Sequence, residues 1–154
     1  MKRLLITVAL AAIFLFVVLA ASRVPQSSVP VAPTQVQAAR TVQLKGQLIR
    51  VSVVDTEDTR RQGLSGRAGL DPDEGMLFIF PEDGIHGFWM KDMRFSIDIF
   101  WLSSDGTIVY MAQNVSPDTY PQNFGSGTPT RYVLELSAGY AETHGVDIGD
   151  VVRL

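Results

Sequence analysis

Apolar residues along this 154-residue chain fall into short runs, several of which alternate with polar residues as half-buried β-strands do. The segment 48–54 (LIRVSVV) is rich in β-branched residues and places Ile49 and two valines on one face. The run 75–80 (GMLFIF) is apolar throughout and ends before Pro81, which favours a strand buried on both faces. Both segments are therefore predicted to be strands.

The same pattern continues through the second half of the chain. A Ser-Ser-Asp-Gly turn at 103–106 lies between two such segments and predicts a β-hairpin. By contrast, segment 116–130 has three prolines and two glycines but no period, and such a stretch is usually functional or mobile. Further strands are predicted at 86–92, 96–102, 107–115, 131–136 and within 146–154.

Two short helices interrupt the strands. Segment 55–63 begins with Asp and Thr as possible caps, has acids in its first turn and arginines later, and ends in glycine. Segment 137–145 has Ser137 as the expected N-cap and Gly145 as the expected C-cap. Many short strands with two short helices predict a mainly β fold, a compact β-sandwich or barrel-like domain preceded by an N-terminal hydrophobic segment.

The first 21 residues are predicted to be a signal peptide or a membrane anchor. Residues 4–21 form an uncharged apolar run of 18 residues behind Lys2 and Arg3. As a helix this run would span ~27 Å, just enough to cross a bilayer. Cleavage would release a secreted or periplasmic protein, and retention would anchor it to the cytoplasmic membrane. Either way, the positive-inside rule predicts that the rest of the chain is extracytoplasmic.

Residues 22–40 contain three prolines and no acidic residue, and they are predicted to be a linker. Residues 41–154 are predicted to be the folded β-domain, long enough for a core without disulfides. This segment has a net charge of −7, and such an acidic surface is a poor nucleic-acid binder. The chain has no cysteine, which excludes thiolate metal sites and a cysteine nucleophile.

Four segments, taken in order, resemble a bacterial and archaeal family of unknown function, domain-of-unknown-function family 192. They are RRQGLSGRAGL, GMLFIFP, GFWMKDMRFSIDIFWLSSDGTIV and RYVLELSAGYAETHGVDIGDVV. The resemblance runs from about residue 48 to residue 152 and implies a compact β-sandwich-like fold, often made behind a signal peptide, with no established activity. Asp92 and Met93 stand where family members usually have Asn-Thr.

The stretch GFWMKDM (87–93) is the sharpest candidate for a ligand site. If the chain after it forms a four-residue hairpin loop, strand alternation places Lys91 opposite Asp98, with Trp89 beside them in an aromatic pair. A lysine and a carboxylate next to aromatic walls suit a small polar ligand or a sugar ring. The alternative is a cross-strand ion pair without a ligand, which contributes at most ~1 kcal/mol.

Four further residues are candidate members of this ligand face. Glu135 alternates away from the apolar residues of its strand, and Arg61 lies at the end of the first predicted helix. Tyr120 and Phe124 belong to the proline-rich segment, which could bound the face. Whether the four join Lys91 depends on the order of the strands in the sheet.

His86, Met90 and Met93 form a second candidate site, because histidine and thioethers can bind Cu(I) outside the cytoplasm. On a strand, His86 and Met90 would share a face whereas Met93 would fall on the other, and Met90 is also a suitable core residue. The sequence has no His-x-x-x-His or Cys-His pattern for zinc. We therefore expect no bound cofactor.

These observations favour an extracytoplasmic β-domain that binds a small polar ligand or an envelope polymer, and they lean against an enzyme. Two alternatives stay open: a hydrolase acting on an envelope component, and a structural or assembly partner of another envelope protein. The chain has no Gly-x-Ser-x-Gly elbow. Glycosidase chemistry would need a carboxylate pair at a suitable separation, for example Asp98 with Glu135.

Overall fold

The structure is a computed structural model that describes residues 39–154. The apolar run 4–21 and most of the predicted linker lie outside the described residues. Within residues 39–154, no helix is both long enough and apolar enough to cross a membrane.

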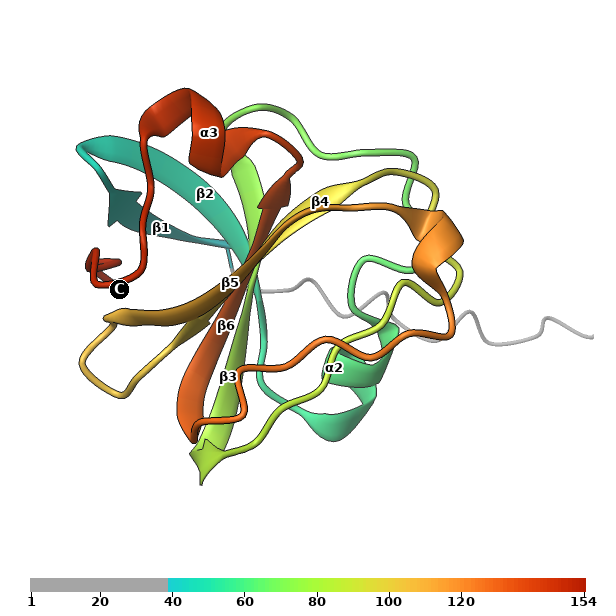
Figure 1. The fold of residues 1–154 in the computed structure, drawn as a ribbon, viewed down its shortest axis with the longest axis horizontal. Coiled ribbons are helices and arrows are strands. Elements are labelled where there is room, and N and C mark those ends of the chain that lie inside the picture. Colours follow the sequence, from blue (N-terminus) through green and yellow to red (C-terminus); the bar gives the residue numbers. More distant parts are fainter. Residues whose placement is uncertain (1–38) are drawn as a thin grey trace, which may run out of the picture. The chain divides into compact units, whose positions relative to one another are not determined.

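The described residues are mainly β with two short helices, which confirms the predicted class (Figure 1). The first strand begins at Ala39, two residues before the predicted start of the β-domain. The elements in chain order are β1 (Ala39–Leu44), β2 (Gln47–Val54), α2 (Glu57–Gln62), β3 (Glu74–Gly84), β4 (Ile97–Leu102), β5 (Ile108–Val115), the 3-10 turn η1 (Pro117–Thr119), β6 (Thr130–Ser137) and α3 (Tyr140–His144).

The described strands form one six-stranded sheet in the order β1-β2-β3-β6-β4-β5. The β2–β3 pair is parallel and the other pairs are antiparallel. A sandwich of two packed sheets is therefore wrong. The C-terminal residues connect the two edges of the sheet, because Arg153 bridges to Gln43 in β1 and Val151 bridges to Thr107 just before β5. These bridges stand where the final strand was predicted.

Both faces of the sheet are apolar, and each has its own core cluster. Strand β4 shows why: its residues are all buried, and alternation sends Ile97, Ile99 and Trp101 to one face and Phe100 and Leu102 to the other. The first core cluster contains Val42, Leu44, Ile49, Val51, Leu77, Phe100, Leu102, Ile108, Leu134, Leu136, Tyr140, Ala141, Val146 and Val152. The second core cluster contains Val54, Leu64, Met76, Phe78, Met90, Ile97, Ile99, Trp101, Val115 and Val133.

Helix α2 confirms the predicted start and stop signals. Thr56 is the N-cap and forms a capping box with Thr59, in which each side chain accepts from the other residue's backbone N–H. Gly63 ends the helix with φ of 48°, a left-handed value that disfavours most other residues. The helix therefore forms from local signals and delivers Arg60 and Arg61 to one face of the sheet.

Helix α3 begins later than predicted, because Ser137 is still part of β6 and pairs with Ile97. The N-cap is Gly139, whose side chain cannot accept a hydrogen bond. The carboxylate of Asp98 accepts instead from the backbone N–H groups of Gly139 and Ala141. A residue 41 positions away in the chain thus supplies the cap that the local sequence lacks.

The predicted strand at 86–92 is wrong, and so is the hairpin that would place Lys91 opposite Asp98. Segment 85–96 is a loop, and its β pairing is limited to an isolated bridge between Phe88 and Phe124. Strand β4 is flanked by β5 on one side and β6 on the other, so neither of its edges is open to segment 86–92. Asp98 lies opposite Leu136 of β6 instead.

Candidate functional site

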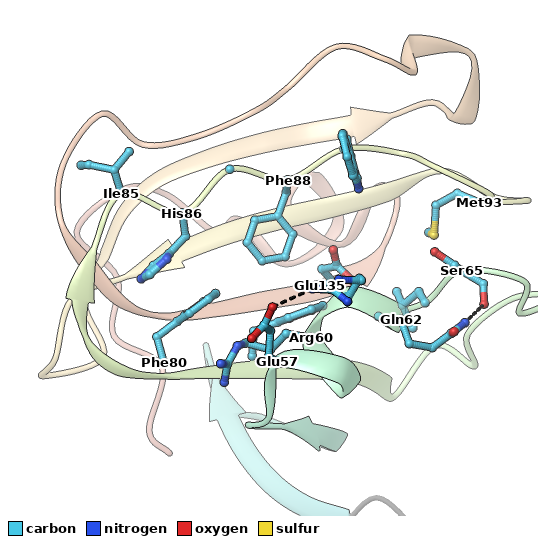
Figure 2. Close-up of a pocket in the computed structure, with 16 residues that line it drawn as sticks. Glu57, Arg60, Gln62, Ser65, Phe80, Ile85, His86, Phe88, Met93 and Glu135 are labelled. Carbon is cyan, nitrogen blue, oxygen red and sulfur yellow. Dashed lines mark hydrogen bonds and ion pairs between the residues drawn. The ribbon is translucent and has the colours of Figure 1, made fainter. Parts of the chain in front are cut away.

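A pocket of about 370 Å³ lies over the second core cluster, between α2 with the residues that follow it and the loop 85–93 (Figure 2). Strands β3 and β6 supply its floor. Figure 2 shows Phe80 and His86 at one end of the pocket, Met93 and Ser65 at the other, and Glu135 between them. The lining residues are Glu57, Arg60, Arg61, Gln62, Gly63, Leu64, Ser65, Phe78, Phe80, Ile85, His86, Gly87, Phe88, Trp89, Met93 and Glu135.

Aromatic rings form much of the wall. The rings of Phe78 and Phe88 meet edge to face with centroids 4.8 Å apart, and Phe88 meets Trp101 in the same way at 5.8 Å. Phe80 stacks on the imidazole of His86 with ring centroids 3.4 Å apart. Because these rings hold one another in place, the pocket offers a rigid apolar surface.

Glu135 is a buried acid at the floor of the pocket. Its residue lies between Met76 of β3 and Ile99 of β4, on the face of β6 that also carries Val133. Only 6% of its surface is exposed, and its Oε2 atom has no hydrogen-bond partner. Burial raises the pKa of this carboxyl from 4.5 to about 8. At neutral pH the side chain is therefore an uncharged acid that can donate one hydrogen bond and accept others.

Two arginines of α2 approach the pocket in different ways. Arg60 donates to the backbone carbonyls of Asp55 and Ile79 and places its guanidinium 5.1 Å from the ring centre of Phe80. Arg61 is exposed and pairs with Glu57 at 2.6 Å. The Arg60 guanidinium is thus held by backbone and ring contacts, whereas the Arg61 guanidinium is held by an exposed ion pair.

His86 is neutral at ordinary pH. Its Nε2 lies 3.0 Å from the backbone oxygen of Thr130, and because a carbonyl only accepts, Nε2 carries the hydrogen. Burial lowers the pKa of His86, and the nearby charge of Arg60 lowers it further, although the hydrogen bond to Thr130 acts in the other direction. The backbone oxygen of His86 also accepts from Trp101 Nε1 at 2.8 Å. These bonds fix the start of the loop over the sheet.

A second hollow, of about 630 Å³, shares Arg61, Gln62, Ser65 and Trp89 with the pocket. It adds three residues of its own: Gly66, Lys91 and Asp92.

Two hydrogen bonds join the walls of this hollow. Ser65 Oγ donates to the backbone oxygen of Lys91 at 2.9 Å, and the Gly66 N–H donates to that of Asp92 at 2.9 Å. The pocket and the second hollow are therefore two parts of one groove, which we call the groove below.

Three predicted site residues, Trp89, Glu135 and Arg61, line the pocket together. Lys91 lines the second hollow beside Trp89 and Arg61. The four residues therefore line the same region: Arg61 lies on α2, Trp89 and Lys91 on the loop, and Glu135 on β6. The predicted hairpin does not contribute to this arrangement.

The two residues predicted from the proline-rich segment lie beside the loop. The ring of Tyr120 meets Trp89 at 6.0 Å, and both are well exposed, at 46% and 53%. Phe124 exchanges two backbone hydrogen bonds with Phe88, at 2.7 and 2.8 Å. Segment 116–130 therefore supports the loop that carries Trp89.

Asp98 does not belong to this site. It shares its face of β4 with Phe100, so it points away from Glu135, and it is fully buried. Its carboxylate accepts from the backbone N–H groups of Asn114 at 2.7 Å, Ala141 at 2.9 Å and Gly139 at 3.3 Å. Within residues 39–154 it forms no ion pair with Lys91, and it cannot act with Glu135 as a carboxylate pair.

The three residues proposed for Cu(I) do not converge. Met90 is buried in the second core cluster and does not line the pocket. His86 and Met93 do line it, but at opposite ends (Figure 2). Among residues 39–154 there is also no group of three His, Cys, Asp or Glu side chains placed to hold a metal ion.

Arg60 and Phe80 are two of the several pocket residues that were not named as candidates from the sequence. A helical period would have placed Glu57, Arg60 and Leu64 on one face of the helix and its continuation. That period indicates which helix residues face the sheet, and it does not distinguish a pocket residue from a core residue. The stacking of Phe80 on His86 has no counterpart in the local pattern.

One family model and two solved structures resemble this chain. The model of family DUF192, described as an uncharacterised ACR, matches residues 38–154. A solved structure from Sinorhizobium meliloti 1021, described as a candidate transcription regulator, is 34% identical with a TM-score of 0.72, covering 76% of this chain and 94% of that one. A protein of unknown function from Novosphingobium aromaticivorans DSM 12444 is 26% identical with a TM-score of 0.74, covering 80% and 91%. A comparison with curated proteins gives no match.

Proposed function

The chain belongs to the uncharacterised family DUF192, and we propose that it binds a small ligand in the pocket over Glu135. The ligand has an apolar body that packs on the aromatic wall and a polar group that reaches the buried acid. A pocket with an aromatic wall and a few polar groups is the common form of a small-molecule site.

The observation that carries this proposal is the unpartnered Oε2 of Glu135. A buried polar atom without a hydrogen bond costs about 1–3 kcal/mol, so proteins keep few of them. A ligand hydroxyl or carbonyl that bonds to this acid would recover that free energy. The hydrogen bond that Glu135 lacks without a ligand would therefore add to the free energy of binding when a ligand supplies it.

The test protein is the fragment 36–154. This fragment contains all the described residues, 39–154, which form one compact unit with the whole sheet and both core clusters. We expect 1-octanol to raise its Tm in proportion to ln(1 + [L]/Kd) and to shift its tryptophan emission to shorter wavelength, because an alkyl chain replaces water at an indole ring. Trp89 is exposed in the pocket and Trp101 is fully buried, so Trp89→Phe should remove the emission shift while the Tm shift persists.

Two variants of Glu135 separate the hydrogen bond from the apolar pocket. Glu135→Gln keeps a donor and an acceptor, so 1-octanol should bind within about twofold of the parent. Glu135→Leu removes both and should weaken binding about fivefold, the value of one neutral hydrogen bond. If neither a Tm shift nor a change in tryptophan emission occurs with 1-octanol, sugars or cell-wall fragments, the binding proposal is wrong.

Catalysis is the second candidate function, and the raised pKa of Glu135 favours it. A carboxyl that is protonated at neutral pH inside a pocket is suited to act as a general acid. The reaction would be hydrolysis of an envelope component. Turnover of nitrophenyl glycosides or esters that disappears in folded Glu135→Gln would support an enzyme, and binding without turnover would support the binding protein.

We also place the compact unit outside the cytoplasm, on the basis of the basic and apolar residues 1–21. Alkaline phosphatase fused after residue 154 should be active in cells, because that enzyme requires oxidation in the periplasm. N-terminal sequencing of the exported protein would separate cleavage from anchoring. An inactive fusion that accumulates inside the cell would contradict export.

A further inference from the structure

We propose that the ligand of the groove is an anionic amphiphile, whose acidic group lies between Arg61 and Lys91 while its chain extends into the pocket toward Glu135. This inference rests on the proposed function, since it names the chemical class of the same ligand. The acidic group is a carboxylate or a phosphate, and the far end of the chain carries the hydroxyl or carbonyl that meets Glu135.

The first support is the local charge. Residues 41–154 have a net charge of −7, yet the basic residues of the groove, Arg60, Arg61 and Lys91, outnumber its two exposed acids, Glu57 and Asp92. The remaining acid of the groove, the buried carboxyl at its floor, is uncharged at neutral pH because burial raises its pKa to about 8. A positive groove in an acidic protein attracts anions and repels cations.

The second support is that two of these cations are not neutralised by the protein. Within residues 39–154 neither Arg60 nor Lys91 forms an ion pair, and the contacts of Arg60 are backbone carbonyls and an aromatic ring. Arg61 is paired with Glu57 at 2.6 Å and with Asp58 at 3.9 Å, but both pairs are exposed, and exposed pairs of these spacings are weak. A ligand acid can therefore replace Glu57 as the partner of Arg61 at little cost.

The third support is the shape of the groove. Arg61 and Trp89 line both the pocket and the second hollow, so one molecule can contact both parts. The bond from Ser65 to the backbone of Lys91 holds that lysine on the wall opposite Arg61. A carboxylate or phosphate between them can accept two parallel hydrogen bonds from the guanidinium and one from the ammonium. The aromatic wall then takes the apolar chain.

Four probes with the same eight-carbon chain test the inference on fragment 36–154. They are 8-hydroxyoctanoate, 1,8-octanediol, 8-amino-1-octanol and octanoate. We expect 8-hydroxyoctanoate to bind about tenfold tighter than the diol, the amine to bind more weakly than the diol, and octanoate to lose only the contact with Glu135. The advantage of the acid should shrink as salt is raised, because the arginine and the lysine are exposed.

The variants Arg61→Ala and Lys91→Ala should each reduce the preference for acid over diol to about threefold, and the double variant should abolish it. Diol affinity should stay unchanged in all of them. Lys45→Ala is the matched control, since it removes one positive charge at a residue that does not line the groove and should leave the preference intact.

Each other outcome overturns a distinct statement. Equal binding of acid and diol, or tightest binding of the amine, overturns the anion inference while the proposed function stands. If none of the probes shifts the Tm or the emission of Trp89, both are overturned. A final experiment measures binding of the fragment to phosphatidylglycerol vesicles. If the double variant still binds them, the anionic lipid binds outside the groove, and this result also overturns the inference.

Discussion

Asp98 and Glu135 stand on neighbouring strands of one sheet, and both carboxyls are almost completely buried, at 0% and 6% exposure. Asp98 faces α3 and accepts hydrogen bonds from three backbone N–H groups. Glu135 faces the pocket, and its Oε2 has no partner. Burial alone therefore says little about the role of an acid. The carboxylate whose bonds are complete holds the fold together, and the acid whose bonds are incomplete is available to a ligand.

The largest effect is expected from Asp98→Ala. The change leaves three backbone N–H groups without an acceptor, one buried and two partly buried, and should lower the free energy of unfolding by about 3–5 kcal/mol. Urea denaturation of fragment 36–154 measures the loss. Asp71→Ala, at an exposed loop position, should stay within ~0.5 kcal/mol of the parent. If Asp98→Ala lowers the free energy of unfolding by less than ~1 kcal/mol, the proposed structural role of Asp98 is wrong.

A smaller loss of stability is expected when the pH is raised, because Glu135 is buried without the hydrogen bonds that Asp98 has. Its pKa is raised to about 8 in the folded state. The unfolded chain therefore ionises first as pH rises, and stability falls across the interval between about pH 4.5 and 8. The slope is ~1.4 kcal/mol per unit, so raising pH from 6 to 7.5 should cost about 2 kcal/mol.

Glu135→Gln should remove this slope, because glutamine does not ionise. The readout is the difference between parent and variant at each pH, since other groups titrate as well. Burial lowers the pKa of His86, so protonation of His86 destabilises the fold as pH falls below about 6.5, a change of opposite sign that both proteins share. Parallel stability profiles for the two proteins would contradict the buried, neutral acid.

The smallest effect on stability is expected from Trp89→Ala. The side chain is half exposed and contacts Tyr120 at the rim of the groove, so the loss should be no more than ~1 kcal/mol. Binding of 8-hydroxyoctanoate should nevertheless fall about tenfold, because Trp89 lines both parts of the groove. A large loss of stability with unchanged binding would make Trp89 a structural residue and move the ligand elsewhere.

Much of the local structure follows from the sequence. Alternation and β-branched residues identified β2, β3, β4 and β6, and the Asp-Gly turn correctly predicted the β4–β5 hairpin. Capping residues placed α2. Trp89, Glu135 and Arg61 were also named as candidates, which is much of the pocket's polar and aromatic character. Their grouping with Asp98 was wrong, because it assumed that segment 86–92 pairs with β4.

What the sequence by itself determined is set by neighbours within a few residues: side-chain period, caps, turns and the charge of each segment. Which strand lies beside β4 depends on β6, which begins only at Thr130, and on which strands pair with the two edges of β4. Only the tertiary structure decided that Asp98 meets the start of α3 and that Glu135 has no partner. Hydrogen-bond satisfaction and burial are properties of surroundings assembled from distant segments, and so they appear only when the sheet has formed.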